Sequence, residues 1–310
     1  MLVTSPLIQL HGVDKYYGKR QVLHQINLQV GCGEVVGFLG PNGAGKSTTM
    51  SILAGVLAPC AGSVQVAGIN MVQQPERAKV HLGFLPEQPP LYKEMTVSDY
   101  LHYLAQLRGV ATGQRQTRVA EVLSLCGLGA VSGRLLGHLS KGYQQRAGLA
   151  QALVHQPNVV VLDEPTVGLD PIQIQEIRAL IRQLGQQCAV LLSTHILSEV
   201  RMTCDRVVLI HQGQVRLNTS MKDLDQRLAG PRAFYVQFGC DPGAQKLQAL
   251  QGVAQVQAQQ EGWLITPDAQ DDPTQAVVAA AVAQQWDLRC LQPQQLPLES
   301  LFTQLVEAEA

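Results

Sequence analysis

The residues best suited to chemistry lie between positions 40 and 48, where an apolar run gives way to glycines, a lysine and hydroxyl side chains. This stretch has the G-x-x-x-x-G-K-S spacing of a phosphate-binding loop, in which glycines let backbone N–H groups turn toward phosphate oxygens. Lys46 would add a positive charge beside the β- and γ-phosphates, and the Ser47 hydroxyl would bind Mg²⁺. We therefore expect a nucleoside triphosphate to bind to Gly40, Pro41, Asn42, Gly43, Ala44, Gly45, Lys46, Ser47 and Thr48.

Two adjacent carboxylates follow another apolar run, in residues 159–170, which read VVVLDEPTVGLD. The run predicts a buried strand of a parallel sheet. Asp163 at its end would hold Mg²⁺ through water, and Glu164 would polarise a water that attacks the γ-phosphate. Taken alone, both carboxylates are equally well explained as solvated loop residues. The phosphate-binding loop favours the catalytic interpretation, because open α/β sheets bind ligands at the carboxyl ends of their strands.

A third apolar run, in residues 188–200, ends in a histidine, His195. A strand here would bring His195 to the same edge of the sheet, within reach of a γ-phosphate.

A further anion site is predicted by the stretch HLSKGYQQR at residues 138–146. Ser140 reads there as the N-cap of a helix whose first N–H groups are free to attract an anion.

These motifs, in this order, resemble those of the ATP-binding subunits of ABC transporters, above all the bacterial subfamily that serves ABC-2-type exporters. The resemblance covers about residues 6–220. It implies that two subunits pair head to tail, so that Ser140 and Gly142 of one chain grip the γ-phosphate held by the Lys46 loop of the other. It also implies that Glu164 is the catalytic carboxylate and His195 the switch histidine.

The resemblance assigns three further roles and leaves some open. Asp170 matches the loop that crosses the dimer interface, and Tyr17, with Tyr16 as the alternative, matches the aromatic residue that stacks on adenine. An exposed tyrosine pair without that role is the other interpretation. Glu87 stands where the family has a glutamine near Mg²⁺, although Gln88 is adjacent. An ionised carboxylate there still binds a cation, but it cannot donate a hydrogen bond.

The signature stretch departs from the family at Lys141, where a glycine is usual, and at Tyr143, where a glutamine is usual. Lys141 would either add charge near the partner's phosphates or face solvent. A coupling helix of a membrane subunit would, by resemblance, enter a groove lined by Tyr92 and Met95. The same apolar side chains are otherwise part of the internal core.

These residues require an α/β fold: a P-loop NTPase core, an antiparallel edge sheet from residues 6–30 and a helical subdomain at about 87–155. A shift in charge predicts a domain boundary near residue 220, because residues 1–220 carry net +5 and residues 221–310 net −6. The second part, 221–310, reads as βαββαβ, the order of a ferredoxin-like unit, followed by an amphipathic helix at 297–309. We expect it to be regulatory, to support dimerisation, or to be a folded appendage.

Composition limits the function further. The chain has 310 residues, 46% hydrophobic and 15% charged, with a net charge of −1, so we expect a globular protein that does not bind nucleic acid. Its 7 cysteines lack CxxC spacing, which indicates a reducing compartment. No signal peptide or membrane span is expected.

Together these patterns predict an ATPase that uses ATP and Mg²⁺ to power a transporter, by resemblance an exporter. Its expected partners are a separate transmembrane permease and a second copy of itself or a paralogous ATPase subunit. Its expected location is the cytoplasm, on the inner face of the membrane through the permease. The alternatives are an ABC ATPase acting on ribosomes or DNA, and a kinase or GTPase. An ABC ATPase that acts on ribosomes or DNA usually has a second cassette or a basic surface, and this sequence shows neither. A kinase or GTPase would not explain residues 138–146.

Overall fold

A computed structural model describes residues 5–227, 233–259, 261–268 and 272–293 of the chain. It divides into two compact units, Met1–Met221 and Lys222–Ala310. The division falls close to the point where the sequence changes from a basic to an acidic, glutamine-rich composition.

The first unit is built on a mainly parallel sheet with the strand order β10-β9-β3-β8-β7-β6. Only the pairing of β10 with β9 is antiparallel among these strands. Every residue of the three central strands is buried, as expected for strands covered on both faces. The strands are β3 (Val35–Leu39), β6 (Leu82–Leu85), β7 (Val159–Asp163), β8 (Ala189–Thr194), β9 (Arg206–His211) and β10 (Gln214–Ser220).

An antiparallel sheet with the order β2-β1-β4-β5 flanks this core. It confirms the edge sheet that the alternating pattern of residues 6–30 predicts. Helix α1 (Lys46–Leu53) contacts strands of both sheets, and its Met50 and Leu53 belong to one buried cluster with Leu28 and Val161. The flanking strands are β1 (Ile8–Tyr17), β2 (Arg20–Val30), β4 (Ala61–Val66) and β5 (Ile69–Asn70).

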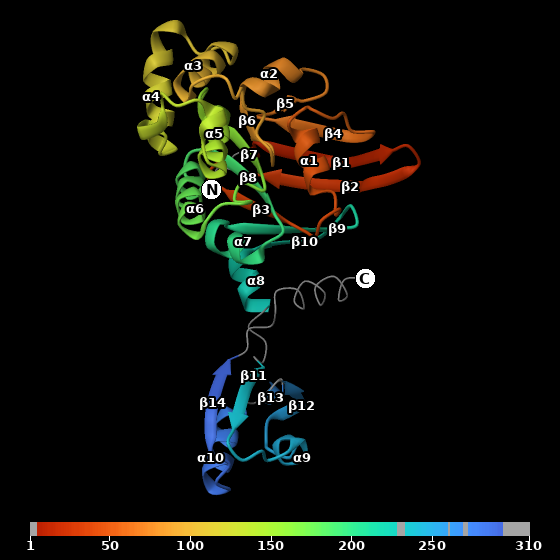
Figure 1. The fold of residues 1–310 in the computed structure, drawn as a ribbon. Coiled ribbons are helices and arrows are strands. Elements are labelled where there is room, and N and C mark those ends of the chain that lie inside the picture. The colour runs from red at the N-terminus through yellow and green to blue at the C-terminus, as the bar shows by residue number, and fades with distance from the viewer. Residues whose placement is uncertain (1–4, 228–232, 260, 269–271, 294–310) are drawn as a thin grey trace. The chain divides into compact units, whose positions relative to one another are not determined.

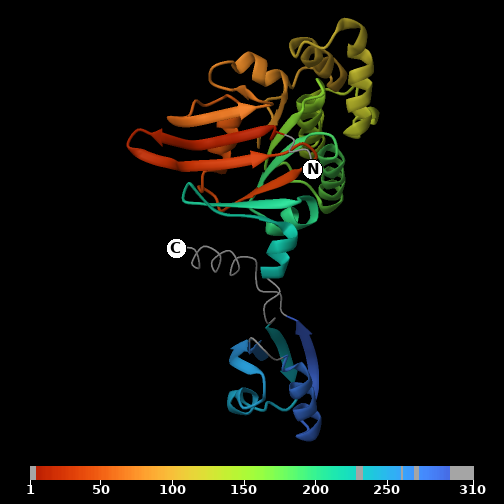
Figure 2. The ribbon, with the colours of Figure 1, turned by 180° about the vertical axis from the view of Figure 1, so that it is seen from behind.

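The region between β6 and β7 is helical, as its sequence periodicity predicts. Figures 1 and 2 show α3 and α4 on the side of the unit opposite the β1–β2 hairpin. Tyr92 precedes these helices and is half exposed, with its ring 5.8 Å from that of Tyr100 and 5.9 Å from that of Tyr103. The helices of this region are α3 (Val97–Leu107), α4 (Arg115–Leu125) and α5 (Lys141–Leu153), whereas α2 (Pro75–Val80) precedes β6.

Two more helices complete the first unit. α6 (Pro171–Gly185) and α7 (Leu197–Thr203) pack on each other, and both contact β3 and β8. α8 (Met221–Arg227) follows β10. Within the described part of the chain, every helix is too short or too polar to cross a bilayer.

The second unit has the βαββαβ order that its sequence predicts. Its strands form an antiparallel sheet in the order β12-β13-β11-β14, and a small core includes Phe238, Leu247, Val277 and Trp286. The helix predicted at 297–309 lies outside the described residues. The elements are β11 (Phe234–Phe238), α9 (Ala244–Gln248), β12 (Val253–Gln259), β13 (Gly262–Pro267), α10 (Thr274–Ala283) and β14 (Leu288–Pro293).

Candidate active site

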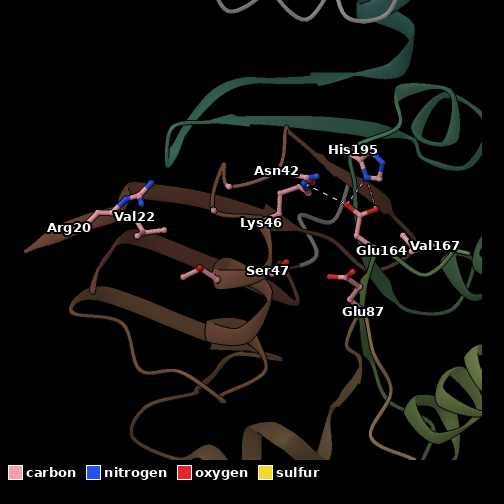
Figure 3. A pocket seen from close by; sticks show the side chains of 12 residues that line it. Arg20, Val22, Asn42, Lys46, Ser47, Glu87, Glu164, Val167 and His195 are labelled. Carbon is pink, nitrogen blue, oxygen red and sulfur yellow. Dashed lines mark hydrogen bonds and ion pairs between the residues drawn. The ribbon is translucent and has the colours of Figure 1, made fainter. Parts of the chain in front are cut away.

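A cavity of about 430 Å³ lies where the loop after β3 meets the ends of β7 and β8 (Figure 3). It collects side chains that are far apart in the sequence, including Lys46, Glu87, Glu164 and His195. Its lining consists of Arg20, Val22, Asn42, Gly43, Gly45, Lys46, Ser47, Thr48, Glu87, Glu164, Val167 and His195. Nine of these twelve residues were expected at the site from the sequence.

The loop after β3 is shaped to bind an anion with its backbone. Gly45, the N-cap of α1, has φ 109° and no side chain to accept the first N–H groups of the helix, which therefore remain available to a ligand. A Cβ at Gly45 would lie only 2.6 Å from Cδ2 of Leu23. The positive end of the α1 dipole adds to the attraction for phosphate. Gly40, Pro41 and Ala44 support this loop but do not line the cavity.

Lys46 is held at the base of the loop. Its ammonium donates to the carbonyl oxygens of Gly40, at 2.8 Å, and Pro41, at 3.2 Å. It also lies 3.6 Å from Oε1 of Glu164, and both side chains are almost completely buried. Because both groups are shielded from water, the ammonium of Lys46 and the carboxylate of Glu164 interact strongly with each other until an anion enters the loop.

Glu164 is at the centre of the site, between the lysine and His195 (Figure 3). Nδ1 of His195 lies 3.0 Å from Oε2 of Glu164 and 3.1 Å from Oε1. The backbone of Glu164 is left-handed, with φ 48°, which side chains rarely adopt. Its N–H donates to the carbonyl and to Oγ of Ser193, both at 3.2 Å. Such local strain persists where the surrounding structure fixes it, and it is common at functional sites.

Asp163 lies behind the cavity lining rather than in it. It is buried, and Oγ of Ser193 donates to Oδ1 of Asp163. Ser193 was not predicted from the sequence, because a serine two residues before His195 has no distinctive spacing. Because Ser193 contacts both carboxylate residues, it fixes the end of β7 to the end of β8.

Two predictions for the rim of the cavity had different outcomes. Glu87 lines the cavity, whereas the neighbouring Gln88 does not, so the structure favours Glu87 at the position near the phosphates. Tyr17 is 49% exposed at the end of β1 and does not line the cavity. Arg20 and Val22 of β2 line that side instead, and neither was expected from the sequence.

Comparisons with known proteins agree with this geometry. The family model of ABC transporters matches residues 23–167. The chain is 36% identical over 226 residues to the uncharacterized ABC transporter ATP-binding protein YdbJ of Bacillus subtilis, an alignment that covers 72% of each chain. This chain belongs to the ATP-binding subunits of ABC transporters.

Two other relatives are informative. The bacitracin transport ATP-binding protein BcrA of Bacillus licheniformis is 36% identical over 213 residues, covering 68% of this chain and 69% of its own. A dimeric ATP-binding cassette, solved in a post-hydrolysis state with ADP and Pi, superposes with a TM-score of 0.63 at 25% identity, covering 69% of this chain and 98% of the other. The chain is therefore an ATPase that binds ATP.

The second group of predicted site residues lies elsewhere in this ABC ATPase. Ser140 caps α5 and accepts from the N–H of Tyr143 at 3.5 Å, as predicted for an N-cap, and Asp170 caps α6 in the same way, accepting from the N–H of Gln173 at 2.9 Å. This group has five members, none of which lines the cavity: Ser140, Lys141, Gly142, Tyr143 and Asp170.

The starts of α5 and α6 contact each other in the same chain. A Cβ added to Gly142 would collide with the side-chain amide of Gln173, and one added to Gly168 would collide with the ammonium of Lys141. The side chain of Lys141 thus lies over the loop between Glu164 and Asp170. This contact connects the signature stretch to the loop that begins at the cavity.

Proposed function

We propose that this subunit drives an exporter by ATP-dependent pairing of two ATPase subunits against a separate transmembrane permease. The observation that carries the proposal is that the cavity contains Lys46, Glu164 and His195 but none of the residues of the signature stretch. A second chain, joined head to tail, would supply Ser140 and Gly142 to the open side of the phosphates. The name of the bacitracin transport relative supports a role in transport.

In the proposed reaction, ATP binds with its phosphates against the N–H groups of the loop and the ammonium of Lys46. Lys46 then exchanges its contact with Glu164 for one with the phosphates, which frees the carboxylate to accept a proton from water as that water attacks the γ-phosphorus. His195, 3.0 Å from the carboxylate, orients Glu164 and contacts the γ-phosphate. As the water oxygen bonds to the γ-phosphorus, the bond from phosphorus to the β–γ bridging oxygen breaks, so the products are ADP and inorganic phosphate. Glu164 then releases its proton to phosphate or water.

The donor set near the phosphates fits Mg²⁺. Ser47, Glu87 and the buried Asp163 all present oxygen atoms, which this hard cation prefers. When bound, Mg²⁺ neutralises charge that develops on the phosphate oxygens. Ser47 and Glu87 would lie next to it, with Asp163 acting through water.

We propose that Tyr17 stacks on adenine after nucleotide binds, with Val22 as the apolar surface on the other side.

The second unit, Lys222–Ala310, is proposed to support dimer formation. A chain ending at residue 227 would then pair more weakly in ATP than the full chain, as measured by light scattering.

The test is the size of the Glu164→Gln variant, with and without ATP and Mg²⁺. The amide keeps the shape of the side chain but cannot act as a base, so the variant should bind ATP, fail to hydrolyse it and double in mass by light scattering. Glu121→Gln, at an exposed position of α4, is the matched control and should hydrolyse ATP like the wild type. A Glu164→Gln variant that hydrolyses ATP normally would refute the assignment of the base.

A further inference from the structure

A buried carboxylate that does not line the cavity lies between the two loops that carry the catalytic pair. Glu199, on α7, is 3% exposed. Oγ1 of Thr166 donates to its Oε1 at 2.8 Å, and Oγ1 of Thr194 donates to its Oε2 at 3.0 Å. Thr166 follows Glu164 by two residues, and Thr194 directly precedes His195. One side chain therefore joins both loops.

The geometry of this bridge leaves little freedom. An ionised carboxylate only accepts hydrogen bonds, so both threonine hydroxyls must point their hydrogens at Glu199. Oγ1 of Thr194 in turn accepts from the N–H of Ile196 at 3.1 Å. Both threonines are buried, so bulk water cannot replace their bonds to Glu199. Hydrogen bonds to a charged acceptor are also stronger than neutral ones.

The charge of Glu199 is compensated from a third element. Nη2 of Arg178, on α6, lies 3.8 Å from Oε1 of Glu199. α6 begins next to Asp170, at the end of the loop that starts at Glu164. The loop is thus fixed to α7 twice. Thr166 bonds to Glu199 directly, and Arg178, on the helix that follows the loop, pairs with the same carboxylate.

We propose that Glu199 is a positioning residue for ATP hydrolysis, which sets the placement of Glu164 relative to His195. This inference rests on the proposed roles of those two residues. Glu199 acts through Thr166 and Thr194, because it does not line the ATP cavity. The phosphate-binding loop follows a different strand, β3, so Glu199 affects hydrolysis much more than it affects ATP binding.

The expected kinetic signature is a loss in kcat with little change in KM. A displacement of about 1 Å of a catalytic group can lower a rate about 10²-fold. Glu199→Ala should therefore lower kcat on the order of 10- to 100-fold, while KM for ATP stays within about 3-fold of the wild-type value.

The test measures kcat and KM of the full chain for Glu199→Ala, Glu199→Gln and the control Glu121→Ala, which changes an exposed glutamate on α4. Glutamine keeps the bridge, since its amide accepts from one threonine and donates to the other. Glu199→Gln should thus recover most of the lost kcat, and Glu121→Ala should match the wild type. Wild-type kcat in Glu199→Ala, a parallel rise in KM, or a Gln variant no better than Ala would each overturn the inference.

Hydroxyl variants keep the inference testable if Glu199→Ala does not fold. Thr166→Val removes the bond to Glu199, and Thr194→Val removes both its bond to Glu199 and the one that it accepts from the N–H of Ile196. Neither changes side-chain size much, and both should lower kcat. Thr166→Ser and Thr194→Ser keep the hydroxyl and should retain kcat; serine variants as slow as the valine variants would contradict the bridge.

Glu164→Gln is measured in the same assay. If it hydrolyses ATP normally, the proposed function fails; if it is inactive while the Glu199 and threonine variants are all normal, only the bridge fails.

Discussion

Glu164 and His195 contact each other across the carboxyl ends of β7 and β8, with Nδ1 of the imidazole 3.0 Å from Oε2 of the carboxylate. Glu164 also lies 3.6 Å from the ammonium of Lys46. The carboxylate is therefore positioned by a neighbour on each side. The lysine contact is the one that an incoming phosphate would replace, whereas the histidine contact can persist through hydrolysis.

Substitution of His195 should affect the reaction more than nucleotide binding. His195→Ala removes the group that orients Glu164, and we expect kcat to fall on the order of 10²-fold with a small change in the dissociation constant for ATP. Steady-state hydrolysis and equilibrium binding of a fluorescent ATP analogue measure the two quantities. His11→Ala is the matched control, since His11 is exposed on β1 and lies outside the cavity lining. An equal loss of binding and kcat would argue against a role confined to hydrolysis.

Arg20 is predicted to contribute to ATP binding from the rim of the cavity. It is exposed, so its interaction with a nucleotide is screened by water and salt. Arg20→Ala should raise KM about 2- to 5-fold with kcat unchanged, and the difference should shrink at high ionic strength. Lys19→Ala, a neighbouring exposed cation that does not line the cavity, should leave KM unchanged. A KM that is insensitive to Arg20→Ala would place the nucleotide away from β2.

The part of the site that could be predicted from sequence is the part governed by local spacing. The phosphate-binding loop, Glu164 and His195 each follow a recognisable buried strand, and parallel strands bring their ends to one edge. Ser193, Arg20 and Glu199 could not be identified this way. Their roles depend on pairings between residues about 30 positions apart or on the turn of a hairpin, and a serine, an arginine or a glutamate has no distinctive spacing there.

In the fold, as in the site, local patterns could be predicted from sequence whereas contacts between distant residues could not. Periodicity predicts the edge sheet, the helical region and the βαββαβ order of the second unit, because each depends on which face of an element is apolar. The contact of Lys141 with the loop at Gly168 was not predicted, since it joins the starts of two helices that are separated by β7. Lys141 is nevertheless exposed, which agrees with one of its two interpretations from sequence, a side chain that faces solvent.

Mixing two inactive variants tests whether the active site is shared between chains. Lys46→Ala loses the phosphate-binding half. Ser140→Asp keeps a good N-cap but brings a negative charge toward the γ-phosphate, so it loses the signature half without unfolding α5. A mixed dimer contains one intact composite site, and the mixture should recover roughly a quarter of wild-type hydrolysis if the chains pair at random.

The control for that experiment mixes Lys46→Ala with Glu164→Gln. Both defects lie in the half-site that one chain supplies, so no intact site can form and hydrolysis should stay absent. Recovery in this control, or no recovery with Ser140→Asp, would be incompatible with a head-to-tail pair.

The stability of the first unit should depend on pH through His155. Burial, with a smaller effect from Arg108, lowers the pKa of His155 to about 4, from 6.5. Its Nε2 lies 3.1 Å from the carbonyl oxygen of Leu82, a contact that suits a neutral ring donating this hydrogen bond. The unfolded chain takes up a proton as pH falls below about 6.5, whereas the folded chain does so only near pH 4. The contribution to stability is therefore complete above pH 6.5 and is lost as pH falls toward 4.

The expected loss is about 2 kcal/mol between about pH 7.5 and about pH 5. Urea unfolding of the wild type and of His155→Gln at both pH values measures it. Glutamine can donate to the same carbonyl but does not titrate, so the variant should lose less stability than the wild type over this interval. Equal losses in both proteins would mean that other groups cause the acid sensitivity. Because ATP binds to the folded state only, the measurement is made without nucleotide, which would otherwise add its own stabilisation.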